Sequence, residues 1–174
     1  MSRQIVLLRG INLGHHNRIS MPVLRQLLAG LGYGDPRTHL QSGNAVLTAE
    51  TEPAETASAV SAAIQTQLDL SIPVIVRTAD ELAAVVAADP LGDIATDPTK
   101  YLVRFLDAPP DPAGLPDEAR YAPERYAVRG REVYLWLPKG VHASRLDPAL
   151  SRALGVATAR NWRTVRALLE LAER

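Results

Sequence analysis

The organisation of this chain is clearest in RTHLQSGNAVLTA, residues 37–49. Its two ends, RTHLQ (37–41) and AVLTA (45–49), have the length of short β-strands. The SGN between them (42–44) is typical of a tight turn, because glycine and asparagine tolerate positive φ. We therefore expect a β-hairpin at this point of the sequence.

The hairpin is flanked on both sides by a helix and a further strand. Before it, QIVLL (4–8) predicts a strand covered on both faces, and Ser20 can cap a helix that ends near Gly32 and Gly34. After it, Pro53 opens a second helix and PVIVR (73–77) reads as a strand. The apolar positions that mark the two helices are Val23, Leu24, Leu27, Leu28 and Leu31, then Ala57, Val60, Ile64 and Leu68. The order β-α-β-β-α-β is typical of a ferredoxin-like unit.

The second half repeats this order imperfectly. Thr78 and Glu81 form a capping box for a helix, and a loop rich in Asp, Pro and Gly follows at 89–99. TKYLVRFL (99–106) predicts a strand, the proline-rich stretch 107–123 stands where a helix would be, and RYAV (125–128) and VYLWLP (133–138) predict a hairpin. A short helix is expected at 147–154 and a terminal one at 162–172.

Two related halves are the simplest interpretation of this pattern. YLVRFL echoes IVLLRGI, and the echo aligns Arg104 with Arg9. We therefore expect an α+β fold of two tandem ferredoxin-like halves packed together, the second one degenerate. The expected boundaries are 1–88 for the first half and 89–174 for the second, which ends in the terminal helix.

Composition excludes several classes of protein. The 19 basic and 19 acidic side chains cancel, which argues against a protein that coats nucleic acid by bulk charge. The absence of cysteine removes disulfides, thiol nucleophiles and thiolate metal sites, and it fits a cytoplasmic protein. The N-terminal apolar run is broken by Arg9 and is too short for a signal peptide or a membrane span. We expect no membrane partner.

One edge of the first half concentrates polar residues. In a ferredoxin-like unit the end of the first strand lies beside the turn of the central hairpin, so RGINLGHHNR (9–18) and QSGN (41–44) should meet. The first helix begins at the same edge, and its exposed N–H groups favour anions. With Arg9 or Arg18, this edge could hold a carboxylate or phosphate. The alternative is that these asparagines and glycines only build turns, and that Arg9 pairs with an acid such as Asp35.

Five stretches of the sequence together resemble a known family: LLRGINLG (7–14), MPVLRQLLAGLGY (21–33), RTHLQSGNAVL (37–47), VYLWLPKGVHASRL (133–146) and ATARNWRTVRALLEL (157–171). They resemble a bacterial family known as domain of unknown function 1697, with weak similarity over 50–130. The resemblance implies a soluble α+β protein of two related halves and no established activity. The signature residues that it carries over are Arg9, Gly10, Asn12, Gly14, Ser42, Gly43, Asn44, Arg160, Asn161 and Trp162. His15 and His16 stand where relatives have glycine or lysine, so chemistry that requires them would not be that of the family.

Catalytic and cofactor motifs are absent from the sequence. A hydrolase with Ser42 as nucleophile and His15, His16 or His39 as base would need G-x-S-x-G, which QSGN does not provide. The four histidines have no metal-ligand spacing. There is no phosphate-binding P-loop and no G-x-G-x-x-G, and no cofactor is indicated.

Three functions remain open. The first is binding of a small anionic ligand in a polar cleft, where Arg9 and Arg160 would pair charge, Asn12, Asn44 and Asn161 would orient the ligand, and the glycines would let the backbone approach. The second is nucleic-acid binding by the arginine-rich second half, with Trp136 and Trp162 as a stacking platform. The third is a protein-interaction module whose motifs are structural; Asn161 would then only cap the last helix and Trp162 would anchor it.

Overall fold

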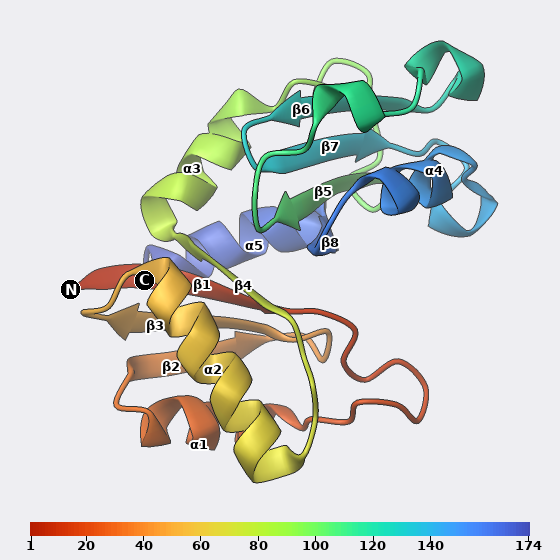
Figure 1. Cartoon of the computed structure of the whole chain (residues 1–174). Helices are drawn as coiled ribbons and strands as arrows, with labels where there is room; N and C mark the ends of the chain where they lie inside the picture. The colour runs from red at the N-terminus through yellow and green to blue at the C-terminus, as the bar shows by residue number, and fades with distance from the viewer. The chain divides into compact units, whose positions relative to one another are not determined.

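The computed structural model describes all 174 residues, and the chain divides into two compact units. Unit 1 comprises Met1–Ala84 and Ala167–Arg174, and unit 2 comprises Val85–Arg166. The boundaries between the units fall within the helices α3 (Ala79–Ala88) and α5 (Trp162–Ala172). Figure 1 shows the elements of both units.

Unit 1 is built on a four-stranded antiparallel sheet of order β2-β3-β1-β4. Its elements follow each other as predicted from the sequence: β1 (Ser2–Leu8), α1 (Met21–Gly30), β2 (Gly34–His39), β3 (Asn44–Ala49), α2 (Pro53–Leu68), β4 (Val74–Thr78) and the start of α3. Because β3 lies between β1 and β2, the end of β1 and the turn between β2 and β3 share one edge of the sheet.

Local hydrogen bonds set the ends of the unit 1 helices. The Val23 N–H donates to the Ser20 hydroxyl at 3.4 Å and so caps α1. At α3 the Glu81 N–H donates to the Thr78 hydroxyl at 3.1 Å, and the Thr78 N–H donates to the Glu81 carboxylate at 2.8 Å. The predicted capping box is therefore confirmed.

The hairpin turn begins two residues earlier than predicted and ends one residue earlier. It spans residues 40–43, with Leu40 at φ 59° and Gly43 at φ 86°, and Asn44 already belongs to β3. The Asn44 side-chain amide donates to the His39 carbonyl at 2.8 Å and holds the two strand ends together. Leucine rarely adopts positive φ, so Leu40 carried no turn signal.

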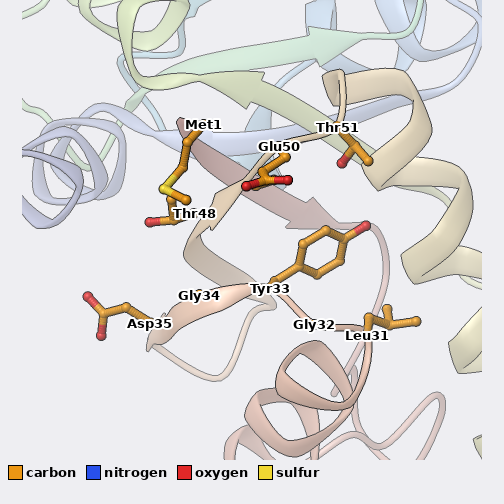
Figure 2. A pocket seen from close by; sticks show the side chains of 10 residues that line it. Met1, Leu31, Gly32, Tyr33, Gly34, Asp35, Thr48, Glu50 and Thr51 are labelled. Carbon is orange, nitrogen blue, oxygen red and sulfur yellow. The ribbon is translucent and has the colours of Figure 1, made fainter.

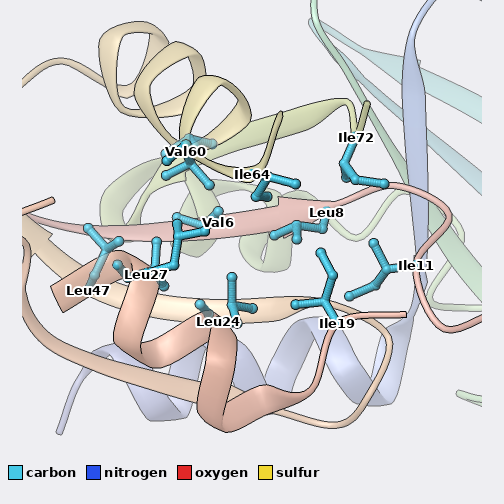
Figure 3. Close-up of a cluster of buried hydrophobic side chains, with 14 of the residues drawn as sticks. Val6, Leu8, Ile11, Ile19, Leu24, Leu27, Leu47, Val60, Ile64 and Ile72 are labelled. Atoms are coloured by element: carbon cyan, nitrogen blue, oxygen red, sulfur yellow. The ribbon is translucent and has the colours of Figure 1, made fainter. Parts of the chain in front are cut away.

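The core of unit 1 lies between the sheet and the helices α1 and α2. Figure 3 shows Val6 and Leu8 of β1 among apolar side chains of both helices, including Leu24 and Ile64. Ile5 and Leu7 point to the opposite face of β1 and are equally buried. The prediction of a first strand covered on both faces is confirmed.

Unit 2 has a four-stranded antiparallel sheet of the corresponding order, β6-β7-β5-β8. Its elements are β5 (Tyr101–Leu106), the 3-10 turns η1 (Pro112–Gly114) and η2 (Glu118–Tyr121), β6 (Arg125–Arg129), β7 (Glu132–Trp136), η3 (Val141–Ala143), α4 (Leu146–Ala153), β8 (Ala157–Asn161) and the start of α5. The proline-rich stretch forms no α-helix, as expected. Strand β8 was not predicted, since ATARN contains only small and polar side chains.

Backbone register corrects the predicted alignment of Arg104 with Arg9. Ile5 pairs with Arg77 in unit 1, and Val103 pairs with Arg160 in unit 2. The Leu8 N–H donates to the Gly43 carbonyl at 2.8 Å, and the Leu106 N–H donates to the Arg131 carbonyl at 2.9 Å. Leu106 therefore corresponds to Leu8, and Asp107 corresponds to Arg9.

Arg104 has a structural task within unit 2. Its guanidinium lies on β5 and contacts the Asp147 carboxylate and the Ser151 hydroxyl of α4, the latter at 2.8 Å. The apolar echo between YLVRFL and IVLLRGI was misleading because short buried strands resemble one another in any register. None of the helices is long and apolar enough to span a bilayer.

Candidate functional site

The segment from Arg9 to Arg18, called loop 9–18 below, leaves the end of β1 and reverses direction. Gly10, Asn12, Gly14 and Asn17 all have positive φ, between 50° and 67°. Leu13 and His16 form an isolated antiparallel bridge across the tip. Glycine and asparagine are the residues that tolerate this backbone, which explains the composition of the loop.

Asn12 fastens loop 9–18 to its surroundings. Its side-chain N–H₂ donates to the Gln41 carbonyl at 2.7 Å and to the Ile19 carbonyl at 2.8 Å, and its Oδ1 accepts from the Ile19 N–H at 2.9 Å. The Asn17 amide donates to the Gly10 carbonyl at 3.1 Å. The loop and the β2–β3 turn therefore lie together, as the predicted strand order required. These bonds give Asn12 a bracing role, and its direct contact with a ligand stays a prediction.

Gly43 of the β2–β3 turn packs closely against Leu8 at the end of β1 and against Ile11 of loop 9–18. A Cβ at this position would lie 2.8 Å from the Leu8 Cβ and 2.8 Å from the Ile11 Cδ1, and φ is 86°. Ile11 and Ile19, at either end of the loop, are both buried in the core of unit 1. Only glycine fits between these side chains without a shift of its neighbours.

Ser42 and Asn44 make contacts inside the turn. The Asn44 amide donates to the Ser42 hydroxyl at 3.0 Å, and Asn44 is fully buried. These contacts are those of a hairpin turn. Binding of a ligand by either residue stays a prediction.

Positive charge gathers on the exposed side of loop 9–18. Arg9 is exposed, and its guanidinium makes no hydrogen bond or ion pair with the chain. Arg18 is exposed too, and its one contact is a long bond of 3.5 Å to the Gly14 carbonyl. His15 and His16 are exposed beside them. Both guanidinium groups are therefore open to an external anion.

The alternative pairing of Arg9 with Asp35 is wrong. Asp35 pairs instead with Arg37 at 2.8 Å and with Arg3 at 3.3 Å. The hydrogen bond from Arg37 and that from Arg3 lower the pKa of this carboxyl below its usual value. Asp35 is also the first acidic residue of the chain, because residues 1–34 contain four arginines and no Asp or Glu.

The third signature motif, Arg160 to Trp162, lies in unit 2. Arg160 lies in β8, directly before the residue that caps α5, and it is buried. Its guanidinium donates to the Thr158 hydroxyl and the Ala159 carbonyl, both at 2.8 Å. Burial lowers the pKa of Arg160 to about 10. The Asn161 Oδ1 accepts from the Thr164 N–H at 2.9 Å and so caps α5, as the structural alternative predicted.

Trp162 belongs to a buried aromatic cluster. Its ring stacks on Tyr101 with centroids 4.8 Å apart, and Tyr134 lies 6.3 Å from each of the other two rings. Trp136 is buried as well. The proposed base-stacking platform therefore has no open indole face, although nucleic-acid binding by other residues is untested.

The signature residues thus fall into two groups. Unit 1 brings together Arg9, Gly10, Asn12 and Gly14 with Ser42, Gly43 and Asn44, while Arg160, Asn161 and Trp162 belong to unit 2. A single cleft that includes both groups stays a prediction. No group of three or more histidine or acidic side chains is placed so that it could hold a metal ion.

Two exposed leucines, one within loop 9–18 and one in the β2–β3 turn, were not singled out from the sequence. Leu13 is 67% exposed and Leu40 is 54% exposed. The bond from Asn12 to Gln41 places these two residues at the same edge of the sheet. Leu13 did carry a signal, since it is one of only two apolar residues in loop 9–18, the other being the buried Ile11.

The geometry defines an α+β protein with two four-stranded antiparallel sheets and a braced, cationic loop on the first of them. Residues 1–134 match the family described as "Protein of unknown function (DUF1697)", and the chain belongs to this family. The match includes loop 9–18 and the hairpin turn, and it ends before β8. The family assignment from the sequence is confirmed.

One solved structure similar to this chain is "The structure of conserved bacterial protein SP0830 from Streptococcus pneumoniae". The two chains are 18% identical, the TM-score is 0.73, and the match covers 98% of each. At this identity the similarity establishes the fold alone. No curated protein matches the chain.

Proposed function

We propose that the protein binds a small anion, a phosphate- or carboxylate-bearing molecule, at loop 9–18. The observation that carries the proposal is the exposed guanidinium of Arg9, which has no partner in the chain. Arg9 is the first residue of loop 9–18, which the hydrogen bonds of Asn12 hold in place. Arginine presents several N–H donors in one plane, so it suits bidentate contact with either kind of anion.

The surroundings of Arg9 support an anion over any other ligand. Loop 9–18 contains Arg9 and Arg18 and no acidic residue. The first turn of α1 contains no acidic residue either, and the N-terminus of a helix favours negative charge. An approaching anion therefore meets positive potential from the loop and from the helix together.

The proposal divides the signature residues of unit 1 by task. Arg9 and Arg18 contact the ligand, and the glycines at positive φ allow its approach to the backbone. Asn12 and Gly43 keep the loop in place through the bonds and contacts given above. A preordered loop loses little conformational freedom on binding, which benefits affinity. Contributions of Arg160, Asn161 and Trp162 remain part of the cleft hypothesis and need a separate test.

Thermal unfolding at low salt tests the proposal, with sugar phosphates, nucleotides, dicarboxylates and short oligonucleotides as probes. A probe at about a hundred times its dissociation constant should stabilise the protein by about 2.7 kcal/mol. Arg9→Ala should abolish that stabilisation and leave the unliganded midpoint nearly unchanged, since exposed substitutions cost about 0.5 kcal/mol or less.

Arg152→Ala is the matched control. Arg152 is an exposed arginine on α4 of unit 2 with no partner in the chain, so its loss should not affect binding at loop 9–18. Equal effects of the two variants would contradict the proposal and indicate nonspecific charge attraction. Stabilisation by oligonucleotides alone, with a steep salt dependence and sensitivity to Arg152, would favour the nucleic-acid alternative.

The exposed leucines favour one second candidate, a protein-interaction module. Leu13 and Leu40 lie at the same edge as Arg9, and apolar side chains rimmed by cations suit an acidic partner surface. Leu13→Ser should then abolish capture of a partner by the immobilised protein. The same variant should leave binding of a small anion intact, which separates this candidate from the first.

We also infer that the two units are degenerate copies of one ferredoxin-like half, with the linker after α3 as their boundary near residue 88. The matching strand orders and the matching backbone bonds of Leu8 and Leu106 support this. Separate expression of 1–88 and 89–174 is the test. Cooperative folding of each fragment, or of their mixture, is expected.

A further inference from the structure

A pocket of about 470 Å³ lies in unit 1, at the end of β1 that is remote from loop 9–18. β1 begins at Ser2, directly after the pocket-lining Met1, and ends at Leu8, directly before Arg9, so the two places lie at opposite ends of the same strand. Figure 2 shows the lining, which comes from the end of α1, the start of β2 and the end of β3. The polar side chains of the lining are those of Tyr33, Asp35, Thr48, Glu50 and Thr51.

An aromatic ring forms one wall of this pocket. Tyr33 is half-buried and packs against the core of unit 1 together with Leu31. Its neighbours in the chain, Gly32 and Gly34, have no side chains that could cover the ring. Figure 2 shows the phenol in the middle of the lining, with Glu50 and Thr51 on the side of β3.

The polar groups of the lining are mostly engaged within the chain. Asp35 is bound by Arg3 and Arg37. The Thr48 hydroxyl accepts from Arg3 at 3.1 Å, and the Thr51 hydroxyl bonds with that of Thr56 at 2.9 Å.

The Tyr33 hydroxyl and the Glu50 carboxylate are the exceptions, and of these only Glu50 is charged. Its carboxylate is exposed and makes no hydrogen bond or ion pair with the chain. The pocket therefore presents one uncommitted negative charge beside one accessible aromatic ring.

We propose that this pocket binds an organic monocation, an ammonium or amidinium group carried on a short apolar or aromatic body. The Glu50 carboxylate pairs with the cation, and the Tyr33 ring contacts it through cation–π attraction or stacks on its body. The volume lies within the range of about 300–1,000 Å³ that is usual for small-molecule sites. One uncommitted carboxylate supplies too few oxygen ligands for Ca²⁺, which takes about six to eight.

Calorimetric titration of the full chain with benzamidine and phenethylamine tests this site. Benzamide and 2-phenylethanol are the uncharged counterparts and should bind at least about tenfold more weakly, because they cannot pair with Glu50. Glu50→Gln should weaken the cationic probes about three- to tenfold, and Tyr33→Leu by a similar factor.

Three control variants make the result specific. Glu52→Gln removes an exposed carboxylate two residues away that does not line the pocket, and it should leave affinity unchanged. Tyr33→Phe keeps the ring and should bind as the wild type does, which preserves the test if Tyr33→Leu does not fold. Arg9→Ala should bind the cations with the affinity of the wild type, so the cation site and the anion site can be tested independently.

Some outcomes would overturn the proposal. One is binding of charged and uncharged probes with equal affinity. Another is an equal loss of affinity in Glu50→Gln and Glu52→Gln. Absence of binding by the wild-type protein at millimolar probe concentration would overturn it as well.

Discussion

The two central strands, β1 in unit 1 and β5 in unit 2, end in the same backbone arrangement and in opposite charges. Leu8 and Leu106 donate to equivalent carbonyls of the adjoining hairpins. At the next position, the Arg9 N–H donates to the Pro73 carbonyl at 3.0 Å, and the Asp107 N–H donates to the Val156 carbonyl at 3.3 Å. At this matched backbone position unit 1 has a cationic side chain, Arg9, and unit 2 has an anionic one, Asp107.

The surroundings of the two strand ends differ as well. In unit 1 the chain continues into loop 9–18, while in unit 2 it continues into a proline-rich segment beside a pocket of about 260 Å³ lined by Asp107 and Asp111. An anion attracted to Arg9 would be repelled by Asp107. The comparison shows that the same backbone arrangement can present side chains of opposite charge at the end of the central strand. Unit 2 can therefore serve as an internal control for unit 1.

The largest expected effect is a loss of stability at Trp162, the residue that follows β8, whose counterpart after β4 is Ala79. Thr78 and Asn161 cap α3 and α5 respectively, so Ala79 in unit 1 corresponds to Trp162 in unit 2. Trp162→Ala should cost about 3–5 kcal/mol in urea unfolding, because it removes a buried ring from the stack on Tyr101. Trp162→Phe keeps a ring there and should lose much less. If Trp162→Phe instead abolished anion binding with little loss of stability, a ligand role for Trp162 would follow.

The second effect compares the glycines of the two hairpins. Gly43→Ala combines positive φ with overlaps at Leu8 and Ile11 and should cost about 3 kcal/mol. Gly130 also has positive φ, at 56°, but a Cβ added there would have no atom within 4 Å, so Gly130→Ala should cost about 1 kcal/mol. Urea midpoints of the two variants measure the difference. Equal losses would mean that Gly43 does not lock the loop onto the turn.

The third effect compares the polar braces of the two units. Asn12 makes three hydrogen bonds in unit 1, and in unit 2 Glu124 accepts from the Ser144 hydroxyl and from the Arg145 and Leu146 N–H groups. Asn12→Ala and Glu124→Ala should each cost about 2 kcal/mol in urea unfolding. Only Asn12→Ala should also weaken anion binding. A loss below about 0.5 kcal/mol in either variant would show that the brace is dispensable.

Sequence reasoning succeeded where local chemistry determines the structure. Ser20, Thr78 with Glu81, and Asn161 are caps whose hydrogen bonds the structure contains. The meeting of RGINLGHHNR with QSGN also followed, because strand order in this topology places the start of β3 beside the end of β1.

It failed where tertiary contacts override local preference. Leu40 adopts a positive φ that leucine normally avoids, which moved the turn. β8 holds Arg160 in a buried position, although arginine is seldom buried and ATARN lacks an apolar strand pattern. The correspondence of Arg9 with Asp107 depends on backbone register, which similarity between two short apolar runs could not reveal.

The Ile19 amide proton makes the state of loop 9–18 observable without any ligand. Its partner is the Asn12 Oδ1 rather than another backbone group, so exchange of this proton with solvent requires release by the Asn12 side chain, which also binds the Gln41 carbonyl of the hairpin turn. The hydrogen-exchange rate of the Ile19 amide therefore measures how often the Asn12 brace of the proposed binding edge opens. The protection of this one hydrogen reports how often the edge is assembled before any ligand arrives.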